Sequence, residues 1–161
     1  MNRSEPDDRR VLDDRPLLRS EPEYGALVCL TCNNGFPWKS IIHHLNGGHG
    51  FTIDLYRPIL RSFELETLAE DWGDLRRPID GSAPIEGLKV RSGFVCMGCG
   101  CKTTSGQLIK THSKCGQTVR RVHLQCWNIH GDAAYWTVVL PPPMHAATNR
   151  PLTSHAGSLI L

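Results

Sequence analysis

Two pairs of cysteines have the spacing with which a polypeptide commonly holds a metal ion. Two residues separate Cys29 from Cys32, and two residues separate Cys96 from Cys99; a valine precedes each pair and histidines follow. A Cys-x-x-Cys turn presents two thiolates to one tetrahedral ion, and a histidine pair about a dozen residues later completes a structural zinc site. The repeat therefore predicts two modules, each held together by zinc.

The first unit offers a complete set of four ligands. Eleven residues separate Cys32 from His44, and four more precede His49, close to the usual zinc-finger spacing. Phe36 and Ile41 fall where a small finger packs an aromatic and an aliphatic side chain beneath its metal. A unit of about thirty residues buries too little apolar surface to fold alone, so metal binding must supply much of its folding free energy. The predicted ligands are Cys29, Cys32, His44 and His49.

His43 is an alternative to its neighbour His44 as the third ligand. On a helix, adjacent side chains point about 100° apart, so only one of the two histidines should reach the ion. His44 is preferred because Ile41 stands three residues before it, as Ile109 stands three residues before His112 in the second unit. His43 is then expected at the surface or beside a ligand.

The second unit has three ligands at regular spacing and an open choice for the fourth. Twelve residues separate Cys99 from His112, which fits the zinc-finger pattern. Cys115 is the preferred fourth ligand, because zinc accepts sulfur and imidazole nitrogen alike. His123 and Cys101 are alternatives, although the Cys-x-Cys spacing of Cys101 with Cys99 is too tight for a regular site. The predicted ligands are Cys96, Cys99, His112 and Cys115.

The cysteine content favours metal binding over disulfides. The chain has seven cysteines, an odd number, and no signal peptide is evident, so we expect an intracellular, reducing compartment. Cys126 lies beside Trp127 and is expected to be a small buried apolar side chain.

We expect a small α+β fold in which two zinc-finger-like modules are joined by a short helical region, with disordered N- and C-terminal tails. The 161 residues are 40% hydrophobic and 21% charged, ordinary for a soluble chain without a membrane segment. The expected regions are a disordered charged arm (1–23), the first zinc finger (24–50), a helical linker region (51–86), the second zinc finger with short strands (87–140) and a disordered tail (141–161). The tail ends in apolar residues, which a disordered tail and a fragment of a larger protein would explain equally well.

The spacing of apolar residues predicts the elements outside the cysteine turns. Helical spacing over 53–63 and again over 65–72 predicts two short amphipathic helices, against which the fingers would pack. The segment 84–90 leads into a short strand before the second cysteine pair. Residues with high β propensity at 118–124 and 135–140 predict a hairpin or strand pair.

Positive charge is concentrated in the second unit. Residues 87–131 contain no acidic residue and seven Lys or Arg residues, whereas residues 50–86 contain eight acidic and four basic residues. A basic zinc module can neutralise phosphates and release their counterions, so DNA or RNA is a predicted partner, and a nuclear location is favoured over a cytoplasmic one. The predicted nucleic-acid contacts are Lys102, Lys110, Arg120 and Arg121.

A protein-interaction or structural module without nucleic-acid binding is the alternative function. In that case the basic face is incidental, in keeping with a net charge of only +2. An exposed apolar patch near Trp38 or Trp72 would then capture the partner. The choice between DNA, RNA and protein stays open, as does the oligomeric state.

An enzyme is not expected. A catalytic zinc needs an open coordination position and usually a carboxylate that acts as general base. The sequence contains neither a His-Glu-x-x-His motif nor a His-x-Glu that accompanies a Cys-x-x-Cys pair.

Four motifs together carry a resemblance to a known family. They are Gly25 to Cys32, His44-Leu45 with His49-Gly50, the run Pro78-x5-Pro84-Ile85-x-Gly87-Leu88-x-Val90-x-x-Gly93-x-x-Cys96-x-x-Cys99, and Tyr135-Trp136-x-Val138. Through them, residues 24–140 resemble the fungal family named after protein D of the orsellinic acid biosynthesis cluster. The resemblance implies a paired, divergent zinc-finger domain without a defined biochemical activity. Cys115 departs from the family pattern, which usually has a second histidine near that position.

Overall fold

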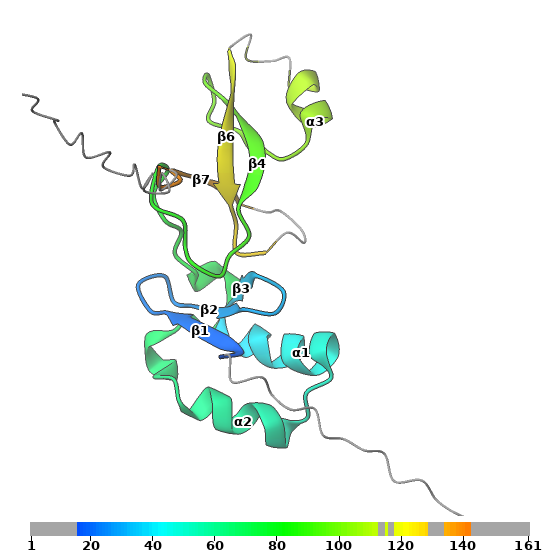
Figure 1. Ribbon diagram of the computed structural model, residues 1–161, viewed down its shortest axis with the longest axis vertical. Helices are drawn as coiled ribbons and strands as arrows, with labels where there is room; N and C mark the ends of the chain where they lie inside the picture. The colour runs from blue at the N-terminus through cyan, green and yellow to red at the C-terminus, as the bar shows by residue number, and fades with distance from the viewer. Residues whose placement is uncertain (1–15, 113–114, 116–117, 129–133, 143–161) are drawn as a thin grey trace, which may run out of the picture.

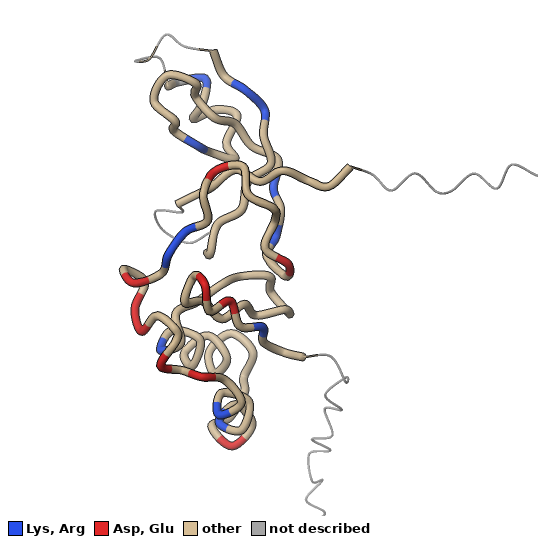
Figure 2. The backbone as a smooth tube through the Cα atoms, turned by 90° about the vertical axis from the view of Figure 1, so that its left-hand side faces the viewer, with Lys and Arg blue, Asp and Glu red and all other residues tan. Residues whose placement is uncertain are grey.

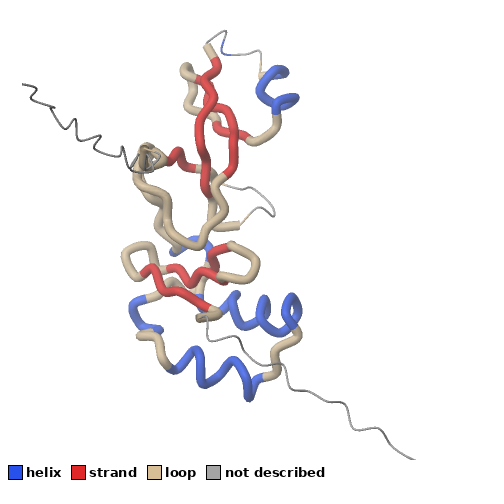
Figure 3. The backbone as a smooth tube through the Cα atoms, viewed as in Figure 1, coloured by secondary structure: helices blue, strands red, loops and turns tan. Residues whose placement is uncertain are grey.

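Two antiparallel sheets lie one above the other along the long axis of the molecule, each with helical segments beside it (Figure 1). The structure is a computed structural model that describes residues 16–112, 115, 118–128 and 134–142 of the 161-residue chain. The first sheet has three strands in the order β1-β2-β3, and the second has four in the order β5-β4-β6-β7. Strands and helices occur in both halves (Figure 3), so the described part of the chain has the predicted small α+β architecture.

The first half contains the three-stranded sheet and two helices. Its elements are β1 (Leu18–Glu21), β2 (Ala26–Cys29), β3 (Asn34–Phe36), α1 (Trp38–His49) and α2 (Ile53–Arg61), followed by two short 3-10 turns, η1 (Leu65–Thr67) and η2 (Trp72–Asp74). Ile41 and Leu45 lie one turn apart on α1 and are both buried, which sets the face of the helix that packs on the sheet.

The second half is built around a long antiparallel pair of strands. Its elements are β4 (Arg91–Cys96), β5 (Lys102–Thr103), α3 (Gly106–Thr111), β6 (Val119–Gln125) and β7 (Trp136–Val138). β4 pairs with β5 on one side and with β6 on the other, and β7 extends the sheet beyond β6. The strand pair predicted for 118–124 and 135–140 is confirmed as β6 and β7.

β2 is buried on both faces and separates two hydrophobic cores. Side chains alternate along a strand, so Leu27 faces one core and Val28 faces the other. The first core lies under α1 and α2. The second core packs β2 against Trp127 and Trp136 from the C-terminal part of the chain. The two predicted fingers therefore share strand β2, which contributes side chains to both cores. They are not separate modules joined only by a linker.

One buried amide fastens the segment between the halves to the second sheet. Gln125 has no exposed surface, and its side-chain Nε2 donates to the carbonyls of Ile85 and Leu88 at 2.9 and 3.0 Å. Its Oε1 accepts the backbone N–H of Ile85 at 2.8 Å. The side chain thus pairs three backbone groups of the Pro-Ile-x-Gly-Leu motif, which explains how Ile85 and Leu88 are buried without a strand of their own.

The predicted disordered arm is too long at its C-terminal end. Leu18–Glu21 form β1, which pairs with all four residues of β2, and Leu18 is buried in the first core. The high charge of the preceding residues obscured this strand. Residues 1–15 lie outside the described part of the chain. In the predicted tail, residues 141 and 142 belong to no helix or strand, and 143–161 lie outside the described residues.

The second helix predicted between the two fingers, over 65–72, is wrong. The segment forms only the turns η1 and η2, although Leu68 is buried in the first core as its apolar spacing suggested. Between the turns, the backbone of Ala69 bonds to the first half: its N–H donates to the carbonyl of Gly25, and its own carbonyl accepts from the N–H of Trp38. These long-range bonds replace the i to i−4 bonds of a helix.

No helix in the described part of the chain has the length and apolar character needed to cross a lipid bilayer.

Candidate metal centres

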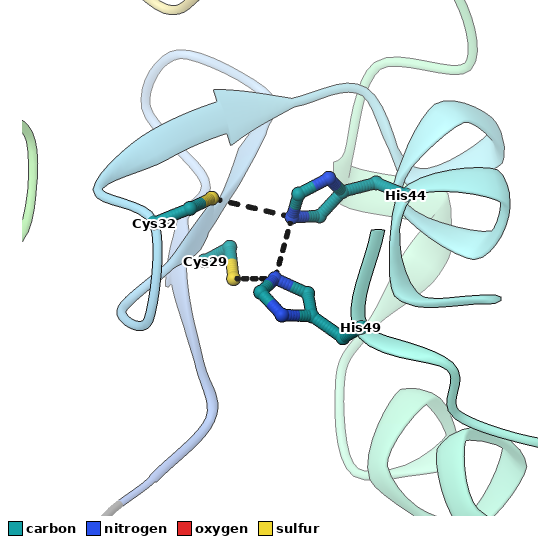
Figure 4. Close-up of side chains that lie close together, drawn as sticks. All are labelled: Cys29, Cys32, His44 and His49. Carbon is teal, nitrogen blue, oxygen red and sulfur yellow. Dashed lines mark hydrogen bonds between the residues drawn. The ribbon is translucent and has the colours of Figure 1, made fainter. Parts of the chain in front are cut away.

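Four side chains of the first half converge at one point (Figure 4). The Sγ of Cys29 lies 3.4 Å from Nε2 of His49. The Sγ of Cys32 lies 3.2 Å from Nε2 of His44, and the two Nε2 atoms are 3.0 Å apart. Bonds of about 2.3 Å to sulfur and about 2.1 Å to nitrogen place tetrahedral neighbours about 3.3–3.8 Å apart. A four-coordinate ion therefore fits this group with small shifts.

The cysteine turns of both halves are closed in the same way. Asn33 has φ 59°, and its backbone N–H donates to the carbonyl of Cys29 at 2.8 Å. Gly100 has φ 70° and donates to the carbonyl of Cys96 at 2.9 Å. Asn and Gly are the residues that adopt this left-handed conformation most readily. Each stands four residues after the first cysteine of its pair, a signal that the sequence carried and that our prediction missed.

α1 supplies both histidines of the first site. The helix ends directly after His49, because Gly50 adopts φ 68° and its N–H bonds to the carbonyls of Asn46 and Leu45. The next N–H, that of Phe51, also donates to Leu45. This closure by a left-handed glycine ends a helix sharply.

Packing selects His44 rather than His43. The ring of Phe36 stacks on that of His44, with centroids 4.2 Å apart and planes at 22°, while Ile41 is fully buried one turn earlier. Gly48 leaves space for the His44 ring, since an added Cβ would lie only 3.2 Å from Nδ1 of His44. His43 is exposed and is not part of the four-residue group.

The second site brings together the four residues predicted for it. The Sγ of Cys99 lies 3.0 Å from Nε2 of His112, and the Sγ of Cys115 lies 3.4 Å from the same nitrogen. With Cys96, their ligand atoms all lie within 4.8 Å of one another. The two alternative ligands, Cys101 and His123, are exposed and outside this group.

The second site is more open than the first. In each half the first cysteine is buried at the end of a strand, but Cys99 is exposed whereas Cys32 is half-buried. α3 leads to His112. Ser105 precedes the helix as its N-cap, and its Oγ accepts the N–H of Leu108 at 3.2 Å.

The ionisation of the thiols and imidazoles reflects their crowding. Burial, and then the charge of Cys29, raises the pKa of Cys32, whereas burial lowers the pKa of His44. In the second site, hydrogen bonding to Cys99, followed by burial, raises the pKa of Cys115 to about 11. Backbone N–H groups lower the pKa of Cys96. Metal binding at either site must therefore displace protons from thiols.

The four predicted nucleic-acid contacts do not form one surface. Arg121 pairs with Phe94 across the β4–β6 ladder, while Arg120 and Lys102 both pair with Val95. Paired residues share a face of the sheet, and successive residues of a strand lie on alternate faces. The side chain of Arg121 therefore lies on one face of the sheet, and those of Arg120 and Lys102 lie on the other. Lys110 of α3 lines the same hollow as Arg121.

Lys102 is also neutralised locally. Its Nζ lies 2.8 Å from a carboxylate oxygen of Asp80, which in turn accepts the backbone N–H of Thr137 at 2.8 Å. Burial by itself would raise the pKa of Asp80, but the hydrogen bonds from Lys102 and Thr137 and the charge of Lys102 together lower it. Along the rest of the second sheet the charged segments are blue in Figure 2, while the red segments gather in the first half and in the connection.

The fold and the two centres define a small α+β module with two Cys/His groups that could each hold a metal ion. The model of the Orsellinic acid/F9775 biosynthesis cluster protein D family matches residues 16–118, and the chain belongs to this family. The predicted resemblance is thus confirmed.

A curated relative of the same description, from Emericella nidulans, is 29% identical over 94 residues. The match covers 58% of this chain and 18% of the relative, so the chain corresponds to a small part of that protein. No solved structure matches the chain.

Proposed function

We propose that this chain is a zinc-binding module in which two structural ions hold a surface that binds nucleic acid. Zinc suits both donor sets, two sulfurs with two nitrogens and three sulfurs with one nitrogen. Each group offers four protein ligands, which would fill the four positions of a tetrahedral ion and leave none for a substrate or reactive water. This closed coordination supports a structural and not a catalytic role for the ions.

The observation that carries the nucleic-acid part is the distribution of charge around the second centre. Residues 87–131 contain seven Lys or Arg residues and no acid, and Lys110, Arg120 and Arg121 are exposed. Positive side chains on a rigid zinc-held sheet can displace counterions from phosphates, the sequence-independent part of nucleic-acid affinity. We also propose a nuclear location, which imaging of a fluorescent fusion tests.

A salt titration tests the proposal. The purified chain should contain two zinc ions, and its affinity for random DNA or RNA should fall steeply between about 50 and 200 mM salt. Replacement of Arg121 with glutamine should lower the slope of log K against log salt by about 0.7–0.9. The matched control is Arg61→Gln, which removes an exposed cation at the end of α2 in the other half and should leave the slope unchanged. Binding that does not respond to salt would contradict the proposal.

Protein binding is the second candidate function, because apolar side chains are exposed in the first half. Ile53 and Leu55 on α2 are each 46% exposed, and Trp72 is 45% exposed at the edge of Phe36. Such side chains can form the centre of a protein interface. Salt-insensitive binding to a protein, abolished by Trp72→Ala but not by Arg121→Gln, would favour this function over the first.

A further inference from the structure

The residues at corresponding positions around the two cysteine turns differ in how deeply they are buried. Two residues before the first cysteine stand Leu27 in the first half and Phe94 in the second. Each pairs across the ladder with the residue four after the second cysteine: Leu27 with Phe36, and Phe94 with Thr103. Leu27 and Phe36 are both buried beneath α1, whereas Phe94 and Thr103 are only partly buried. The aromatic side chain of the second half thus lies on an inner strand, β4, and the described residues cover it only in part.

Among the described residues, a shorter helix lies beside this face of the second sheet. α3 has 6 residues where α1 has 12. Beside it lies a hollow of about 400 Å³, lined by Phe94, Gly106, Ile109, Lys110, Val119 and Arg121. A second hollow of about 290 Å³, lined by Ser92, Gly93, Phe94, Arg121, Val122 and His123, adjoins it. Their size is at the lower end of small-ligand sites, roughly 300–1,000 Å³. Because both include Phe94 and Arg121, we call them together the Phe94 groove.

The Phe94 groove combines an aromatic platform with positive charge. The guanidinium carbon of Arg121 lies 5.9 Å from the centre of the Phe94 ring, and exposed Lys110 lies at the edge of the same hollow. The nearby carboxylate of Asp80 faces Lys102, which lies on the opposite face of the sheet. An occupant with flat apolar rings and negative charge would match both features.

We infer that the Phe94 groove binds single-stranded nucleic acid, with an unpaired base stacked on Phe94 and flanking phosphates against Arg121 and Lys110. The inference rests on the proposed function and adds the form of nucleic acid. A duplex keeps the faces of its bases stacked inside, so only an unpaired base can reach the ring of Phe94. Stacking on an aromatic side chain and cationic contact with the backbone are the two interactions that single strands use.

Binding of the zinc-loaded full chain to four probes of equal length tests the inference. The probes are a mixed-sequence single-stranded DNA, the same sequence as RNA, the DNA duplex, and an abasic strand that has phosphates without bases. Both single strands should bind more tightly than the duplex and the abasic strand. Phe94→Leu removes the aromatic ring and should weaken single-strand binding about fivefold to a hundredfold, while Phe94→Tyr should retain it.

Gly106→Leu is a second variant that keeps the test valid if Phe94→Leu does not fold. Gly106 begins α3, and an added Cβ would lie 3.8 Å from the ring of Phe94 at ordinary contact distance. A leucine there fills the groove without altering charge, and it should reduce single-strand binding but not duplex binding. Metal content and circular dichroism verify the fold of each variant.

The outcomes separate this inference from the proposed function. Equal affinity for single strand, duplex and abasic strand, unchanged in Gly106→Leu, would overturn the groove as the site and leave nucleic-acid binding intact. No affinity for any probe would overturn both. An acidic peptide that binds in the groove, with its affinity lost in Gly106→Leu while none of the strands binds, would assign the groove to a protein partner instead.

Discussion

At the scale of single residues, the cysteine turns depend on one backbone conformation. Gly100 has φ 70°, and a Cβ added there would meet nothing within 4 Å. Gly100→Ala should therefore destabilise the chain by about 1–2 kcal/mol through the left-handed backbone alone. Gly47→Ala is the control: it also meets nothing within 4 Å but lies inside α1 without a positive φ, so it should stabilise by about 0.5–1 kcal/mol. Chemical unfolding at fixed free zinc measures both, and equal effects would contradict this account.

The fourth ligand of the second site can be identified by counting metal ions. Cys115→Ala should reduce the metal content from two ions per chain to one, or weaken the second ion measurably against a chelating dye, because three ligands leave the tetrahedron incomplete. Cys101→Ala removes an exposed thiol outside the group and should retain both ions. A reversed pattern would assign the site to Cys101.

Protonation of Cys115 should make the second site sensitive to pH. Its pKa is raised to about 11 by hydrogen bonding to Cys99 and by burial, so in the absence of an ion it remains a thiol over about pH 6–8. Metal binding must displace that proton, and affinity should therefore rise with pH by about tenfold per unit for each proton released. Calorimetric titration in two buffers of different ionisation enthalpy counts the protons. Cys115→Ala should release one proton fewer on binding the second ion, and equal proton release by the two chains would show that Cys115 is not a ligand.

At the scale of elements, Gln125 of β6 holds the connection between the halves. Gln125→Leu preserves the volume but leaves the N–H and carbonyl of Ile85 and the carbonyl of Leu88 without their partner. Unpaired buried backbone groups should cost about 2–4 kcal/mol together. The neighbouring His123→Leu alters an exposed side chain of the same strand and should change stability by less than about 0.5 kcal/mol. Thermal unfolding of the zinc-loaded variants compares them, and similar losses would refute the role of the buried amide.

Elements whose chemistry is local could be predicted from the sequence, and those fixed by distant contacts could not. The cysteine pairs and their histidines are set by short spacings, and the structure brings together the same two groups of four. By contrast, β1 forms because it pairs with β2 and Leu18 is buried in the first core, and the 65–72 segment is not helical because Ala69 bonds to Gly25 and Trp38. Spacing alone carries no signal for such long-range bonds.

Likewise, the amino-acid composition could not predict on which face of the sheet each Lys or Arg side chain lies. Arg120 and Arg121 are neighbours in sequence, and both were predicted to contact phosphates. A strand directs neighbouring side chains to opposite faces, and the register of β4 with β6 places Arg121 beside Phe94. The cluster of positive charge in the sequence is therefore divided in space between two faces of the sheet.

At the scale of the whole molecule, the two halves pack against each other through a shared core. Ala26 and Val28 of β2 lie in the same core as Trp127 and Trp136, which come about a hundred residues later in the chain. Gly35 of β3 lies directly against Trp127: its N–H donates to the Trp127 carbonyl, and an added Cβ would meet the indole at 2.4 Å. Loss of one half should therefore destabilise the other.

Truncation tests this dependence. The family match ends at residue 118, but β6, β7 and both core tryptophans follow it. A fragment of residues 16–118 removes the strand that pairs with all six residues of β4 and uncovers one face of β2. Full burial of a large side chain contributes roughly 1.5–3 kcal/mol, so loss of the two tryptophans alone should remove much of a typical domain stability of about 5–15 kcal/mol. We expect this fragment to lack a cooperative unfolding transition even with saturating zinc.

A fragment of residues 16–142, which retains every described core contact, should unfold cooperatively with two bound ions. If residues 16–118 unfold with the same midpoint as 16–142, the halves fold independently and the shared strand β2 contributes little to stability.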